Sequence, residues 1–280
     1  MYYDFRECVP VYLEKCYNKS MQEQFKQNIE KKEYEVSEPI LITDQNQEEL
    51  IKKCLPLLNQ FAPESSTKSF FTQRTNKTYV ILVETKETST EAKKAVGISG
   101  FKIEETGLKD KEDRLIKVLY ISFAFIIPEV RGGGQYTMIQ GKIESIANKE
   151  DATYQVLRTQ NGRVWETANK SFSESNTYPN PKISEERIPE QVTKIAQYYN
   201  LNSDGSKKPM KNLVTIMPFY NQLAPVERGC KDPENTNFLE NLFREADKYF
   251  KEQGLVDKNK PFEGIESTHP YSTMVISKFK

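Results

Sequence analysis

The chain has few of the residues that bind metals or form disulfides. Its 280 residues include one histidine, His269, and four cysteines. The cysteines are scattered and form no C-x-x-C pair: Cys8, Cys16, Cys54 and Cys230. Neither a zinc site nor a disulfide framework is therefore predicted, and the pattern is typical of a reduced, cytoplasmic protein. A protein delivered into a host cytosol would have the same composition.

The chain also lacks an excess of charge of one sign. Lys and Arg together number 40, and so do Asp and Glu, so the formal net charge is zero. Proteins that bind nucleic acids or membrane surfaces usually carry a positive excess or a dense basic cluster. The sequence therefore predicts no nucleic-acid partner and no membrane partner.

Long hydrophobic segments are missing as well. The most apolar run, residues 118–127, is about half as long as a membrane-spanning helix needs to be. The N-terminus reads MYYDFRECVPVYLEK, without a basic region followed by an apolar core, so no signal peptide is predicted. The length allows a good core, as one enlarged domain or two small ones.

Hydrophobic periodicity predicts a mixed order of strands and helices. A polar helical leader is expected over residues 1–36, and a polar turn over 106–113. The expected strands are 40–43, 78–84, 95–103, 114–127, 153–159, 213–217 and 273–276. One helix is expected after Asp44, which would cap it, and Pro56 would kink or end it. The other expected helices lie around 136–146, 163–173, 188–199 and 237–253.

The most informative segment is 126–136, which reads IIPEVRGGGQY between an expected strand and an expected helix. Consecutive glycines let the backbone approach a ligand closely, and N–H groups at a helix start favour an anion, usually a phosphate. A dinucleotide-binding segment would read Gly-x-Gly-x-x-Gly after a first strand, and a P-loop would end in Gly-Lys-Ser/Thr. Neither is present. A glycine-rich turn with no ligand is the alternative.

This segment resembles the acetyl-CoA-binding motif of the GNAT acetyltransferase superfamily. That motif has Arg or Gln, two free positions, Gly, one free position, and then Gly or Ala. Arg131 and Gly134 match the first two fixed positions, whereas Tyr136 stands where a small residue is expected. The preceding Pro-Glu and the order of elements from residue 40 to about 173 also match, so the resemblance covers about half of the chain.

The resemblance implies a fold and its parts. The fold class is α/β (α+β): a GNAT-like mixed, mostly antiparallel central sheet flanked by helices, with a long C-terminal helical extension. The expected parts are a helical leader at 1–37 and an acetyl-CoA-binding core at 38–174. The remaining part, 175–280, would complete the sheet and cover the acceptor side.

The resemblance also implies acetyl-CoA as co-substrate, with no metal. The backbone around the glycines would hold the pyrophosphate, and Arg131 would add charge or instead pair with Glu129. The pantetheine arm would pair with the strand before the turn, and Asn161 would contact the pantetheine or the acid region. The implied cofactor-binding residues are Phe125, Ile126, Ile127, Arg131, Gly132, Gly133, Gly134, Gln135, Tyr136 and Asn161.

Acetyl transfer to an amine needs a neutral amine, a stabilised oxyanion and a proton for the leaving thiolate. Family members often carry a carboxylate base on the central strand, but residues 115–128 contain no Asp or Glu. The candidate bases from elsewhere are Glu84, Glu104 and Glu166, of which Glu84 is preferred. Because Phe172 stands about where the family has its tyrosine, the general acid is expected to be Tyr178 or Tyr154.

The sequence thus predicts an acetyl-CoA-dependent N-acetyltransferase that moves an acetyl group to a primary amine by direct attack on the thioester. The amine acceptor would be a small molecule or a protein. The missing strand carboxylate and Tyr136 support an alternative, a catalytically degenerate GNAT-like CoA-binding sensor or scaffold. An interaction module without a nucleotide ligand is a third possibility.

Overall fold

The computed structural model describes residues 34–59, 70–72, 77–86, 93–131, 133–172, 176–201, 205–216, 230–264 and 269–279. The chain divides into two compact units. The first unit holds the described residues of 34–103 and 121–151, and the second unit holds those of 104–120 and 152–279. Two long strands, β4 (Ala95–Lys109) and β5 (Leu115–Ile126), run through both units.

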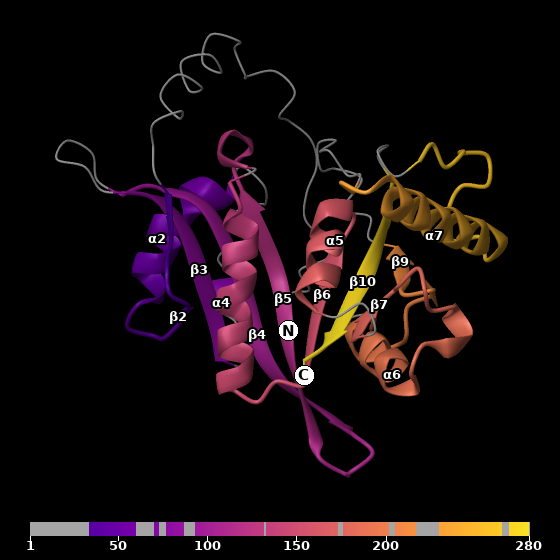
Figure 1. The fold of residues 1–280 in the computed structure, drawn as a ribbon, viewed down its shortest axis with the longest axis horizontal. Coiled ribbons are helices and arrows are strands. Elements are labelled where there is room, and N and C mark those ends of the chain that lie inside the picture. The colour runs from indigo at the N-terminus through magenta and orange to yellow at the C-terminus, as the bar shows by residue number, and fades with distance from the viewer. Residues whose placement is uncertain are drawn as a thin grey trace, which may run out of the picture. The chain divides into compact units, whose positions relative to one another are not determined.

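The sheet of the first unit has the strand order β1-β3-β4-β5 (Figure 1). The short strands β1 (Tyr34–Val36) and β2 (Ile40–Leu41) both pair with β3 (Lys77–Thr85), and β3 pairs with β4; all three pairings are antiparallel. β3 is buried over almost its whole length. Its run of β-branched and aromatic residues suits a strand that is covered on both faces.

Helices cover both faces of this sheet. Helix α2 (Gln47–Leu58) packs its buried residues, Cys54 among them, against Val80, Leu82 and Ile98. The short 3-10 helix η1 (Pro128–Val130) leads from β5 to helix α4 (Gln135–Lys149). Side chains alternate between the faces of a strand, so Tyr79 lies on the face opposite Val80. The Tyr79 hydroxyl donates to Glu150, at the C-terminal end of α4, which places that end on the face opposite α2.

The sheet of the second unit has the strand order β5-β6-β10-β9-β8. Its central strand is the last one of the chain, β10 (Tyr271–Lys278), which pairs antiparallel with β6 (Tyr154–Thr159) and with β9 (Val214–Ile216). β10 also pairs with β7 (Thr177–Tyr178), and β9 pairs with β8 (Met210–Lys211). The last strand of the chain therefore lies inside this sheet, between β6 and β9.

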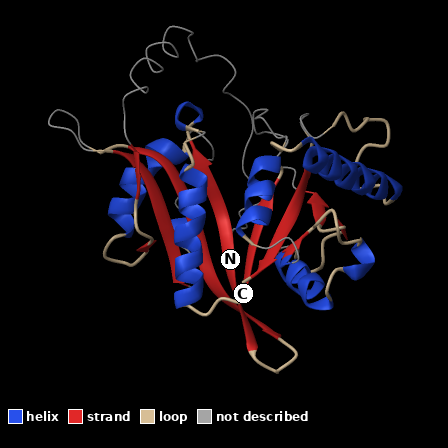
Figure 2. Ribbon diagram, in the orientation of Figure 1, coloured by secondary structure: helices blue, strands red, loops and turns tan. Residues whose placement is uncertain are grey.

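Helices also cover both faces of the second sheet (Figure 2). Helix α6 (Glu190–Tyr199) follows the 3-10 helix η3 (Glu185–Arg187) and packs its apolar side on β5, β6 and β10. Helices α5 (Gly162–Ser171) and α7 (Pro233–Glu252) pack against each other and the other face. Trp165 of α5 meets Phe238 of α7, and Phe250 of α7 stacks on Tyr271 of β10.

The predicted fold class, a mixed and mostly antiparallel sheet flanked by helices, is confirmed. The predicted end of the last long helix is confirmed too, because Gly254 has a φ of 69° and donates to the carbonyl of Lys251. Pro56 lies inside α2, which ends two residues later at Leu58. The part boundaries after residues 37 and 174 stay predictions.

Four local predictions are wrong. Residues 34–36 of the expected helical leader form β1, and residues 1–33 lie outside the described chain. Asp44 does not cap α2, because the residue before the helix is Asn46, whose side chain bonds Thr43 and Leu41 instead. Residues 106–109 of the expected turn continue β4. Helix α7 begins at Pro233 because Asp232 caps it by accepting from the N–H of Glu234 at 2.9 Å.

Gly100 in β4 has no room for a side chain. A Cβ atom there would lie 2.5 Å from the Phe123 ring and 2.6 Å from the Phe70 ring. Gly100→Ala should therefore lower the free energy of unfolding by about 1–3 kcal/mol, measured by urea denaturation. The matched control is Gly141→Ala, in α4 with open space around it, which should raise stability by about 0.5–1 kcal/mol. Equal effects of the two substitutions would contradict the packing described.

Candidate functional site

The glycine turn after β5 forms the start of α4. Gly134, the residue before the helix, has φ 80° and ψ 4°, a left-handed conformation that favours glycine. Because glycine has no side chain, Gly134 cannot cap the helix, and the first helical turn holds no acidic residue. The first N–H groups of a helix have no intrahelical acceptor, and a helix start of this kind favours an anion. Gly132 lies outside the described residues.

The residues around Gly134 shape the turn. The amide of Gln135 folds back so closely that a Cβ atom on Gly133 would lie 2.5 Å from its Nε2 atom. Gln135 is buried, whereas Gly133 is exposed. Tyr136, in the position where the family has a small residue, is partly buried, and desolvation raises its pKa well above the ordinary value of 10. The turn thus exposes backbone at its glycines and closes below them.

Arg131 joins the turn to the strand before it. Its side chain is exposed, and its Nε atom donates to the carbonyl oxygen of Ile126 at 2.8 Å. The guanidinium therefore lies at the end of β5, next to the glycines. There it adds positive charge to a region where the α4 dipole already favours an anion.

Two backbone groups of the strand before the turn already form hydrogen bonds within the protein. Phe125, Ile126 and Ile127 are half-buried, and the N–H of Ile127 donates to Val96 of β4 at 3.0 Å. In an extended strand, successive residues direct their backbone groups to opposite edges, so those of Ile126 face away from β4. The Ile126 carbonyl already accepts the hydrogen bond from Arg131. A ligand that paired with this edge would compete with Arg131 for it.

Glu84, the preferred base, lies at the end of β3 in the same unit as the glycine turn. It is buried, and its carboxylate is 2.7 Å from the Nζ atom of Lys53 in α2. Burial raises the pKa of the neighbouring Cys54 thiol to about 12. The charge of Lys53 lowers this pKa, and the charge of Glu84 raises it. Cys54 is therefore protonated and unreactive at neutral pH.

The second unit holds the other predicted residues. Tyr154 and Tyr178 are buried in one apolar cluster with Val156, Ile195 and Met274, and desolvation raises the pKa of both hydroxyls. Asn161 is the residue before α5, and its side-chain oxygen accepts from the N–H groups that follow it. Each has a structural role in the described chain. Their catalytic and cofactor roles stay predictions.

Glu166, another candidate base, anchors the start of α7. It is buried in α5 and accepts from the backbone N–H groups of Lys231 and Asp232, at 3.0 and 3.3 Å. Desolvation opposes ionisation, but the hydrogen bonds from Lys231 and Asn235 and the charge of Lys170 lower the pKa of Glu166 overall. The carboxylate is thus held as an anion by structural partners.

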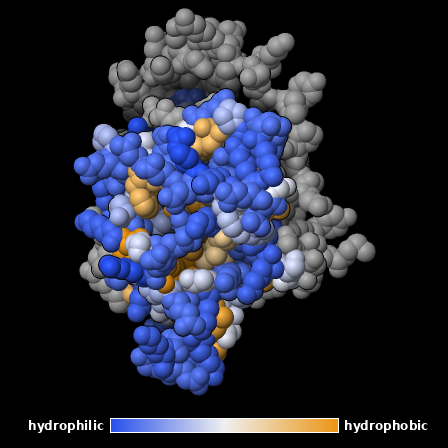
Figure 3. All heavy atoms as spheres, turned by 90° about the vertical axis from the view of Figure 1, so that its right-hand side faces the viewer, coloured by the Kyte–Doolittle hydropathy of each residue, from blue (hydrophilic) through white to orange (hydrophobic). Residues whose placement is uncertain are grey.

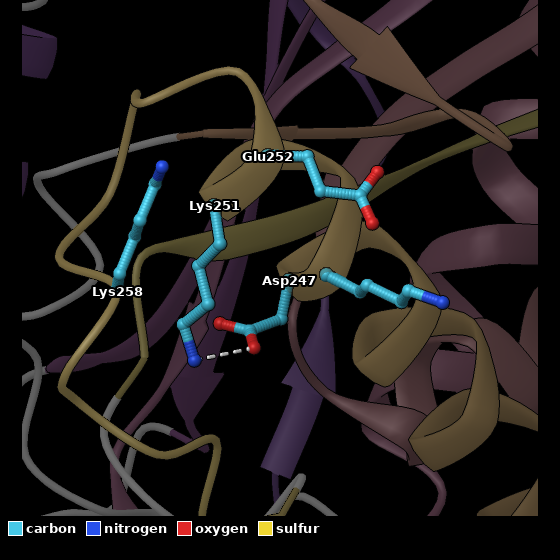
Figure 4. Close-up of a pocket in the computed structure, with 5 residues that line it drawn as sticks. Asp247, Lys251, Glu252 and Lys258 are labelled. Carbon is cyan, nitrogen blue, oxygen red and sulfur yellow. Dashed lines mark ion pairs between the residues drawn. The ribbon is translucent and has the colours of Figure 1, made fainter.

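A shallow hollow lies beside the C-terminal end of α7. Its volume is about 420 Å³, and it is lined by Asp247, Lys248, Lys251, Glu252 and Lys258. Figure 4 shows Lys251 pointing at Asp247, to which it is bonded at 2.7 Å. Asp247 also accepts from the Tyr271 hydroxyl at 2.6 Å. Two of the charges are therefore matched to each other, and we assign no ligand to this hollow.

Within the described parts of the chain, no three His, Cys, Asp or Glu side chains are placed to share a metal ion. No described helix is both long enough and apolar enough to cross a bilayer. On the face drawn in Figure 3, hydrophilic residues predominate and the hydrophobic ones form small separate patches.

No protein-family model and no curated protein sequence matches the chain. Solved structures do. Arabidopsis thaliana NAA60 in complex with acetyl-CoA is 10% identical over 51% of this chain and 87% of its own, with a TM-score of 0.37. A GNAT family acetyltransferase of Staphylococcus aureus subsp. aureus is 16% identical over 42% and 81%, with a TM-score of 0.29. Aminoglycoside N-acetyltransferase AAC(6')-Iy with CoA is 9% identical over 50% and 86%, with a TM-score of 0.33.

The likeness extends over about half of the chain, at low identity.

The partners of Glu166 predict a pH-dependent loss of stability in Glu166→Gln. Because the folded-state pKa of Glu166 is lowered, its contribution is present above the unfolded pKa of ~4.3 and is lost as pH falls through the folded pKa. The substitution should cost about 1–3 kcal/mol of unfolding free energy at pH 7 and less near pH 3, measured by urea denaturation. Glu190→Gln, at an exposed ion pair, should change stability little at either pH.

Proposed function

We propose that this protein is an acetyl-CoA-dependent N-acetyltransferase that moves an acetyl group to a primary amine by direct attack on the thioester. The observation that carries the proposal is the left-handed Gly134, which starts α4 without a side-chain cap and without an acid in its first turn. A diphosphate group is the anion that best fits several adjacent N–H donors. The resemblance of residues 126–136 to the acetyl-CoA motif then selects coenzyme A among diphosphate ligands.

In this proposal the glycine turn and Arg131 hold the pyrophosphate. The helix dipole contributes about 0.3–1 kcal/mol for a charge at an exposed helix terminus. The exposed guanidinium of Arg131 would add a charge-assisted bond from the end of β5. Gln135 and Tyr136 would close the turn below the ligand, in place of the small residue of the family motif.

The pantetheine arm is proposed to pair with the edge of β5 at Phe125, Ile126 and Ile127. The Arg131 side chain must then release the Ile126 carbonyl, or the arm must use the Ile126 N–H alone. A second candidate function is a CoA-binding sensor or scaffold, which the missing carboxylate on β5 and Tyr136 favour. Binding of acetyl-CoA without turnover is the property that would distinguish the second candidate.

The residues that move protons stay proposals. Tyr154 and Tyr178 are protonated at neutral pH, as a general acid must be, but both lie among apolar side chains. Glu84 would have to exchange its ion pair with Lys53 for the substrate amine. The burial of all three favours packing roles, so a base or acid from another part of the chain is compatible with the proposed reaction.

Acetyl-CoA should stabilise the wild-type protein against heat, and Arg131→Glu should abolish most of that shift. The reason is that the substitution replaces a cation beside the pyrophosphate with an anion, which should weaken binding by about tenfold or more. The measurement is the melting temperature with and without acetyl-CoA, repeated with CoA. Lys149→Glu, at the other end of α4, is the control and should keep the full shift.

Two results would contradict this assignment. A wild-type melting temperature that acetyl-CoA and CoA leave unchanged would exclude both coenzyme functions. An Arg131→Glu protein that binds acetyl-CoA as tightly as the wild type would exclude the pyrophosphate assignment. Gly134→Ala adds an independent check, because a left-handed alanine is strained by roughly 1–2 kcal/mol and should distort the turn.

Turnover separates the enzyme from the sensor. With acetyl-CoA and a panel of primary amines, the enzyme should release the free thiol of CoA in proportion to acetylated amine. Because direct attack needs the neutral amine, the rate should rise with pH toward the amine pKa, ~10.4 for a lysine-like amine. Stabilisation by acetyl-CoA with no amine-dependent thiol release on any amine would favour the sensor.

A further inference from the structure

The side-chain amide of Gln135 lies at the start of α4, against the glycine turn. A Cβ atom added to Gly133 would lie 2.5 Å from the Nε2 atom of Gln135 and 3.2 Å from its Oε1 atom. The nitrogen is therefore the end of the amide that comes closest to the turn. Gln135 is only 8% exposed. A hydrogen-bond donor is thus held beside the backbone of Gly133, in the first unit of the chain.

The described part of the chain provides no hydrogen-bond partner for this amide. Among the described residues, the Gln135 side chain is buried without a hydrogen bond or an ion pair. Buried polar groups in proteins are nearly always hydrogen-bonded, because a group that leaves water without gaining a partner destabilises the fold. The position of this amide therefore needs a reason other than stability.

An apolar residue would occupy position 135 at a lower cost. Gln135 is the first residue of a buried row along α4 that continues with Ile139, Ile143 and Ala147. The other members of this row are apolar, and an apolar side chain in the first place would avoid the desolvation of an amide. The acetyl-CoA motif leaves position 135 free. The amide is therefore a property of this chain that neither packing nor the resemblance explains.

The backbone beside the amide has donors of its own. The first hydrogen bond inside α4 runs from the N–H of Met138 to the carbonyl oxygen of Gly134, at 3.0 Å. The N–H groups of residues 135–137 come before it and have no acceptor within the helix. The Gln135 amide adds further N–H donors next to them. An anion with several oxygens is the ligand that satisfies donors gathered in this way.

We propose that the Gln135 side-chain amide donates directly to the anion that binds at the glycine turn, and that Gly133 lacks a side chain to leave room for this amide. The identity of the anion, the pyrophosphate of acetyl-CoA, rests on the proposed function. The donation itself does not, because every diphosphate offers the same oxygens. The amide is neutral, so it adds a directional, charge-assisted hydrogen bond without adding charge to the site.

The test is a double-mutant cycle on the full chain, with acetyl-CoA and inorganic pyrophosphate as ligands in isothermal titration calorimetry. Gln135→Ala removes the amide. Gly133→Ala displaces it, because the three atoms nearest to the new Cβ all belong to Gln135. Each substitution should weaken binding by about tenfold or more. The double variant should bind no more weakly than the weaker single variant, because both substitutions remove the same contact.

Gly141→Ala serves as the control for Gly133→Ala. Gly141 lies in α4 with nothing within 4 Å of its Cβ position, so the substitution should leave both affinities unchanged. A Gln135→Ala protein that binds as tightly as the wild type overturns the proposal. A cycle in which the two single effects multiply overturns it too, because Gly133 would then act on the ligand independently of Gln135.

Thermal melting shows whether each variant folds. If Gln135→Ala fails to fold, Gln135→Glu replaces it, because it keeps the shape of the side chain and exchanges the donor for an anion, and its affinity should fall by about tenfold or more. The two ligands separate this proposal from the proposed function. Pyrophosphate binding that depends on Gln135, in a protein that does not bind acetyl-CoA, would retain the amide contact and exclude the acetyltransferase. A wild type that binds neither ligand would overturn both.

Discussion

The left-handed backbone of Gly134 is the constraint on which the candidate site depends. With φ at 80°, the chain turns from the end of β5 into α4 with its first N–H groups uncapped. An alanine there would be strained even though no atom lies within 4 Å of its Cβ position. The requirement is thus one of backbone conformation and not of space. Arg131 closes the same turn from the other side through the Ile126 carbonyl.

A buried carboxylate needs partners that offset the cost of removing its charge from water, and the described chain shows which partners these are. Glu84 has an ion pair with Lys53, and Glu166 accepts backbone N–H groups that begin α7. Both are balanced by partners that the fold itself needs. Glu104 accepts from the Tyr199 hydroxyl, and the Tyr199 ring stacks on Tyr120.

Much of the fold could be predicted from hydrophobic periodicity. Strand β3 is an unbroken apolar run, as burial on both faces requires. Helix α7 is amphipathic, because burial of one helix face requires a regular spacing of apolar residues. The missed features depend on single contacts. Strand β1 exists because β3 offers it an edge, and α7 starts early because Asp232 caps it. Residues 106–109 look polar enough for a turn, but pairing with β5 extends β4 through them.

The sequence by itself determined the class of the fold, the position of the glycine turn and its resemblance to an acetyl-CoA motif. These are local properties, since a glycine run and an apolar spacing are written in consecutive residues. Only the tertiary structure decided which side chains meet. Tyr199 and Glu104 are 95 positions apart in the chain. No local pattern marks such a pair, because their contact arises from α6 folding onto the sheet that carries β4 and β5.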